Sequence, residues 1–141
     1  MRKPELADEK GVAVVEFALV LPLLLALFFG MVEFGVILYD QHLITNATRE
    51  GARAGIVAQD PRVNDDAIKK IVKDNMSYLI SLGKGAVASQ DPNVIHPTNP
   101  NFGDDLTVNV SYQYHFLVAS ALIPGLGDSI ELRAQTVMKY E

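Results

Sequence analysis

A long apolar stretch near the start of the chain constrains its structure more than any other feature. Residues 12–39 contain only two charged side chains, Glu16 and Glu33. About 20 apolar residues span the hydrocarbon core of a bilayer as a helix, and the 16 residues between these carboxylates are all uncharged. The large apolar side chains cover every side of a helical wheel, so no face is left for water. We therefore predict a transmembrane helix over residues 12–39.

A signal peptide fits this stretch less well, because its apolar core is usually about 7 to 15 residues long and a small-residue cleavage site follows it. Here the core is longer, and no Ala-x-Ala site follows. The leader, residues 1–11, contains Arg2, Lys3 and Lys10, whereas no Lys or Arg follows Tyr39 until Arg49. The positive-inside rule therefore places the amino terminus in the cytoplasm and everything after about Asp40 outside the inner membrane.

Composition excludes several classes of function. The chain has 141 residues, enough for one modest domain, and 12 Lys plus Arg against 17 Asp plus Glu give a net charge of −5. That charge is the wrong sign for a general nucleic-acid binder. The absence of Cys removes thiolate chemistry and cysteine zinc sites, and the three His residues are dispersed. We expect no enzymatic activity, no cofactor and no metal.

Beyond the membrane, the pattern predicts an α+β fold. The first helix continues over residues 40–59, and a small head over residues 60–141 follows it. A second, amphipathic helix begins at Asp60 and Pro61 or at Asn64, and Gly83 ends it. A flexible loop over 84–105 follows, rich in Pro, Asn and Gly.

Two strands close the chain. Residues 106–116 and 130–140 alternate apolar and polar side chains, which is typical of half-buried strands, and we expect them to be antiparallel neighbours. The apolar connection over 117–128 is expected to fold as a short turn of helix before Pro124.

The start of the apolar stretch carries the most specific chemistry. Gly11 closes the charged leader, and Glu16 lies five residues further along. A carboxylate inside a membrane helix costs about 2.5 to 3.5 kcal/mol on insertion scales, so it needs a partner or a function. Cleavage after Gly11 would give Val12 a new terminal ammonium that could meet Glu16 of a neighbouring subunit. The alternative is a carboxylate close enough to the interface to reach water.

This segment resembles the cleavage and assembly motif of type IV prepilins. Three blocks, residues 16–24, 33–35 and 46–53, more narrowly resemble the TadE-like pseudopilins of tight-adherence (Tad, or Flp) pilus systems. The resemblance covers about a third of the chain. It implies a minor pilin-like subunit that a prepilin peptidase processes at Gly11 and Val12. It also implies assembly through Glu16 with other pilin or pseudopilin subunits, an inner-membrane platform and a secretion ATPase.

Further residues are candidates for helix or subunit packing. Ala47, Gly51 and Gly55 form a row of small residues that permits close approach of a helix or sheet, and packing within the chain's own head is the favoured use.

Charged residues on the same stretch allow two interpretations. Arg49, Glu50 and Arg53 lie at helical spacing and form either a solvated face or a contact with the head or a partner. Glu33 is expected to reach water at the interface rather than to pair with a subunit. Pro22 removes one helix hydrogen bond and is expected to shape the span.

Two functional classes remain. The first is a pilin-like subunit that assembles through its helix and reaches the inner membrane or a surface pilus. The alternative is a single-pass membrane-anchored binding module that does not assemble. Glu16 separates them, because a mere anchor has no use for an intramembrane carboxylate beside a Gly-terminated leader.

Overall fold

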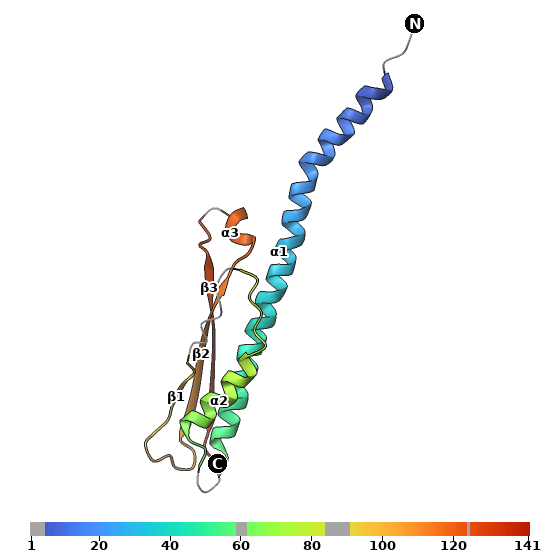
Figure 1. Cartoon of the computed structure of the whole chain (residues 1–141). Coiled ribbons are helices and arrows are strands. Elements are labelled where there is room, and N and C mark those ends of the chain that lie inside the picture. The colour runs from blue at the N-terminus through green and yellow to red at the C-terminus, as the bar shows by residue number, and fades with distance from the viewer. Residues whose placement is uncertain (1–4, 59–61, 84–90, 124) are drawn as a thin grey trace.

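One helix runs through most of the molecule. The computed structural model describes residues 5–58, 62–83, 91–123 and 125–141. Helix α1, Glu5–Ile56, has 52 residues and is about 78 Å long at 1.5 Å per residue. Its amino-terminal half projects beyond the rest of the molecule, and its carboxy-terminal half lies along the head (Figure 1).

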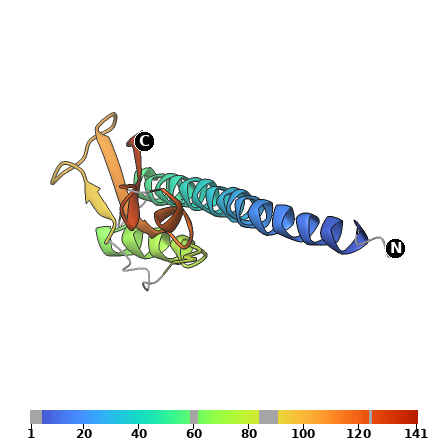
Figure 2. The same cartoon turned by 90° about the horizontal axis from the view of Figure 1, so that it is seen from above.

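Helix α2, Asp65–Met76, packs against the carboxy-terminal half of α1. Asn64 is its N-cap, because the Asn64 side chain accepts a hydrogen bond of 2.9 Å from the Ala67 N–H. Of the two predicted starts, Asn64 is therefore the one observed, and Asp60 and Pro61 lie outside the described residues. The polypeptide reverses between the helices, so α2 lies beside the head half of α1 with the strands next to both (Figure 2).

The predicted end of this helix was wrong. Helix α2 stops at Met76, where the Ser77 hydroxyl donates a hydrogen bond of 2.6 Å to the Asp74 carbonyl. Gly83 has a different use, because a Cβ at this position would collide with the backbone carbonyl of His115. It permits a close approach to the end of a strand rather than capping a helix.

The sheet has three antiparallel strands in the order β1-β2-β3. Strands β2, Asp105–His115, and β3, Ser129–Lys139, pair along their whole length, so the two predicted strands are neighbours as expected. Each begins and ends one residue earlier than predicted. Between them lies the short helix α3, Ala119–Leu122, where a turn of helix was expected.

The segment predicted as a loop, residues 84–105, contains strand β1, Asn93–Ile95, so that part of the prediction was wrong. The three residues of β1, which lie within the segment bounded by Pro92 and Pro97, are too few to show an alternating pattern. They form a strand because they pair with the free edge of β2, where Val94 lies opposite Val108.

One face of the sheet builds the core of the head. Alternate residues of β2 are buried, as the pattern predicted. They pack with apolar residues of α1, α2 and β3 in a single cluster: Ile44, Ala47, Ala52, Ile68, Val72, Met76, Leu106, Val108, Val110, Tyr112, Tyr114, Leu132, Ala134 and Tyr140. The α+β fold with a long apolar first helix is confirmed.

Candidate functional site

The predicted processing and assembly segment lies on the free part of α1. Gly11, Val12 and Glu16 follow one another within an unbroken helix, and all three are exposed. Glu16 makes no hydrogen bond or ion pair with any residue that the structure describes. Val12 and Glu16 are four residues apart and so lie on the same face of the helix. The described part of the head therefore offers this carboxylate no partner.

The helix beyond this segment has the properties of a membrane span. Among the described residues, α1 is long and apolar enough to cross a membrane, and its most apolar window is not buried by the head. A core helix of a soluble protein would be mostly covered. Pro22 lies inside this part, and the helix continues through it. The apolar helix thus supports membrane anchoring.

Glu33 lies at the junction between the projecting half of α1 and the head. The prediction that Glu33 reaches water was wrong. Its side chain is only 2% exposed. The carboxylate accepts hydrogen bonds from three consecutive backbone N–H groups, those of Leu117, Val118 at 3.3 Å and Ala119 at 2.8 Å. These donors precede and begin α3, so Glu33 satisfies backbone groups that a short helix leaves free. The sequence could not indicate this, because 84 residues separate Glu33 from Leu117.

The row of small residues packs inside the chain's own head. Ala47, Gly51 and Gly55 are all buried. A Cβ at Gly51 would collide with Val72, and one at Gly55 would lie 2.5 Å from Leu106 and 2.7 Å from Ile68. The two glycines therefore allow α1 to approach α2 and β2 closely.

The charged residues of the same stretch do not pack inside the head. Arg49, Glu50 and Arg53 are exposed. None of them forms an ion pair or hydrogen bond with the described part of the head. They lie on an exposed face of α1 and do not form the predicted contact with the described part of the head, and a contact with a partner subunit stays a prediction.

A second buried carboxylate on α1 was not predicted from the sequence. Asp40 is fully buried, and its Oδ1 accepts a hydrogen bond of 3.0 Å from the Ile80 N–H. Its Oδ2 and the buried Tyr114 hydroxyl have no hydrogen-bond partner among the described residues. Burial raises the pKa of Asp40 above its ordinary value, although the Ile80 N–H opposes the change. Burial, with help from Glu33 and Asp40, raises the pKa of Tyr114 to about 12.

Other polar contacts bind α1 to the sheet. Thr48 and Thr136 share a hydrogen bond of 2.9 Å, and Gln41 donates one of 3.0 Å to the Arg133 carbonyl. These contacts fix the rotation of α1 against β3. The head is therefore attached to the helix by specific polar groups as well as by its core.

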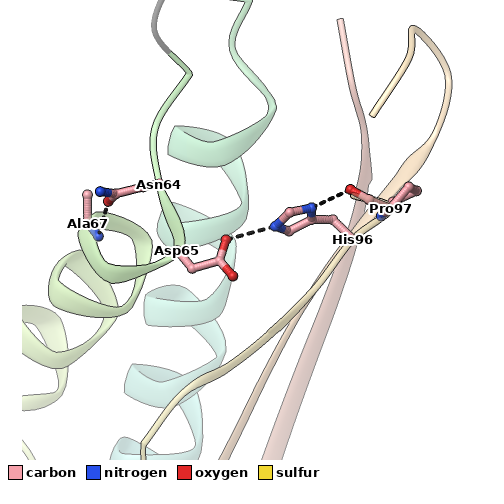
Figure 3. A network of polar contacts seen from close by, with 5 residues as sticks. All are labelled: Asn64, Asp65, Ala67, His96 and Pro97. Atoms are coloured by element: carbon pink, nitrogen blue, oxygen red, sulfur yellow. Dashed lines mark hydrogen bonds and ion pairs between the residues drawn. The ribbon is translucent and has the colours of Figure 1, made fainter. Parts of the chain in front are cut away.

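A polar network at the opposite end of the head ties α2 to the segment after β1 (Figure 3). His96 lies 2.8 Å from the Asp65 carboxylate through Nε2 and 2.7 Å from the Pro97 carbonyl through Nδ1. Because both ring nitrogens face acceptors, the charged imidazolium is favoured. The Pro97 carbonyl and then Asp65 raise the pKa of His96. Arg62 stacks 4.9 Å above the ring of Tyr140 beside this network. These contacts stabilise the distal end of the head.

Comparison with known proteins finds a family resemblance in the first helix. No curated protein and no solved structure matches the chain. The segment that matches a family model begins at the predicted cleavage position and ends three residues before the end of α1. It contains Gly11, Glu16, Glu33 and the helix face that carries Ala47 and Gly51. Over residues 11–53 the chain matches the model of the TadE-like protein family, as the sequence motifs indicated.

Proposed function

We propose that this protein is a minor pilin-like (pseudopilin) subunit of a Tad/Flp pilus, assembled through the projecting half of α1. The TadE-like match over residues 11–53 supports a role associated with this pilus. The observation that carries the proposal is Glu16, an exposed carboxylate with no partner among the described residues, in a part of α1 where residues 12–32 carry no other charge. Since no described residue pairs with it, the proposal takes its partner from a neighbouring subunit.

Processing supplies such a partner. A prepilin peptidase that cuts after Gly11 leaves the Val12 ammonium at the start of the helix. Helix N-termini favour nearby negative charge, and an ammonium–carboxylate contact is among the stronger hydrogen bonds. Pairing with Glu16 of a neighbouring subunit would set the axial register of the helices. The inner-membrane platform and the secretion ATPase would then act on subunits whose heads lie outside the cytoplasm.

The mature protein is expected to begin at Val12. The test is the intact mass of the protein from membranes of a host that contains the peptidase. Gly11→Leu should block the cut and leave insertion unchanged, because the apolar stretch that drives insertion is intact. Gly30→Leu is the matched control, since a side chain at Gly30 would meet nothing within 4 Å. Recovery of the chain with residues 1–11 still attached in this host would contradict the proposal.

The alternative is a single-pass anchor whose head binds a ligand without assembling. It needs the same apolar helix but neither cleavage nor Glu16. A protein that keeps its leader and functions equally well with Glu16→Gln would favour this alternative.

A further inference from the structure

Apolar side chains gather at the end of the head that faces the projecting half of α1. They surround α3, which Figure 1 places at this end. Leu117, Leu122, Ile123 and Leu126 are between 40% and 53% exposed, and we call them the α3 patch. Asp128 is the only charged residue in residues 117–130. Exposed apolar clusters of this kind mark contacts with a protein or a membrane.

The α3 patch lies at a defined level of the membrane helix. Glu33 holds the start of α3 through its three hydrogen bonds, and it precedes Tyr39 by six residues, or about 9 Å along the helix. Over that distance α1 still exposes Phe34, Leu38 and Tyr39. The end of the head is therefore level with a part of α1 that presents apolar side chains to its surroundings.

The length of the uncharged segment also indicates that lipid extends past Glu33. The 16 uncharged residues between Glu16 and Glu33 are about 24 Å long, whereas the hydrocarbon core is about 30 Å thick. The apolar layer must extend past one of these carboxylates. On the side of Glu33 the head already covers the charge and satisfies it with backbone donors. Lipid can approach there without meeting a bare carboxylate.

We propose that the α3 patch inserts into the interfacial layer of the same bilayer that α1 spans. This inference rests on the proposed span. The offset of about 9 Å matches the depth of about 5 to 10 Å at which interfacial helices lie. Lipid is the occupant because the hydrogen bonds to Glu33 hold the patch beside a part of α1 that exposes apolar side chains. Since residues 117–130 contain no Lys or Arg, insertion is apolar and needs no anionic headgroup.

The natural absence of Cys allows a direct test with the full chain. Single variants Leu122→Cys, Leu23→Cys and Phe102→Cys receive an environment-sensitive fluorophore and enter phosphatidylcholine vesicles that contain lipids with a shallow or a deep quencher. Leu23 lies in the projecting helix. Phe102 is 86% exposed and adjoins Gly103, which bonds to Tyr140 near the distal end.

Quenching of the Leu122 probe by the shallow lipid more than by the deep one is expected, together with quenching at Leu23 and none at Phe102. Adding Ile123→Glu and Leu126→Glu should reduce quenching at Leu122, which shows that the patch rather than the probe drives insertion. A Leu122 probe as accessible to water as the Phe102 probe, in vesicles where Leu23 is quenched, would overturn the inference. So would shielding of Leu122 that persists in detergent without lipid quenching, because a second copy of the chain would then cover the patch. Failure at Leu23 would instead contradict the span itself.

Discussion

Gly51 lies where α1 and α2 are packed too closely for a side chain. A Cβ there would collide with Val72, whose branched side chain is stiff. Gly51→Ala is expected to lower the free energy of unfolding by about 1 to 3 kcal/mol, the usual cost of overpacking. This loss should exceed the gain of up to about 1 kcal/mol in helix propensity.

Thermal unfolding of the full chain in detergent micelles measures the effect. Gly35→Ala is the matched control, because Gly35 lies in the same helix and a Cβ there would meet nothing within 4 Å. The control should keep or slightly raise the melting temperature. A Gly51→Ala variant as stable as the Gly35→Ala variant would contradict the close packing.

Asp40 should make stability depend on pH. Its pKa is raised by burial, so the folded state holds this proton more tightly than the unfolded state. Stability is therefore greatest in acid and falls as the pH rises from the ordinary Asp pKa through the raised one. Asp40→Asn keeps an acceptor for the Ile80 N–H and removes the buried charge, so it should be more stable than the parent at neutral pH.

The measurement is the melting temperature of both proteins across this pH range. Because they share every other titrating group, their difference isolates Asp40. The advantage of Asp40→Asn should shrink as the pH falls. An advantage that does not change with pH would argue against titration of this group.

At the scale of elements, α3 depends on α1. A helix of four residues has too few hydrogen bonds to form alone, and Glu33 accepts hydrogen bonds from three consecutive backbone donors, of which two precede α3 and the third, Ala119, begins it. Hydrogen bonds to charged groups contribute about 1.5 to 3 kcal/mol. Glu33→Gln should therefore speed amide hydrogen exchange at Leu117 to Ala119 by about tenfold or more.

Hydrogen–deuterium exchange followed by mass spectrometry checks this prediction. Glu50→Gln makes the same chemical change on the exposed face of α1 and should leave α3 unchanged. Exchange in the core strand β2 serves as an internal reference. Unaltered protection at Leu117 in the Glu33→Gln variant would mean that Glu33 does not hold α3.

Local signals in the sequence were enough to predict some elements and not others. The alternating pattern identified β2 and β3 to within one residue, and the Asn64 cap gave a correct start for α2. Strand β1 and the end of α2 depend on partners distant in the sequence, such as the edge of β2. The burial of Glu33 and Asp40 depends on contacts 84 and 40 residues away. No local pattern encodes such contacts.

At the scale of the whole molecule, the two halves of α1 have separate surroundings. One face of the carboxy-terminal half packs against α2 and the sheet, so the small and polar residues on that face serve the head. The projecting half exposes its apolar side chains and leaves Glu16 without a partner among the described residues. In the proposed function, the first part folds the subunit and the second part joins it to others.

The number of surface pili in cells that carry Glu16→Gln tests this account most directly. Electron microscopy counts the pili, and an immunoblot of the same cells measures the mature membrane-bound protein. Asp74→Asn is the control, since it neutralises an exposed carboxylate of the head. We expect few pili with a normal amount of Glu16→Gln protein, because insertion is unaffected while a contact worth about 1.5 to 3 kcal/mol is lost. Abundant pili at a normal protein level would contradict assembly through Glu16.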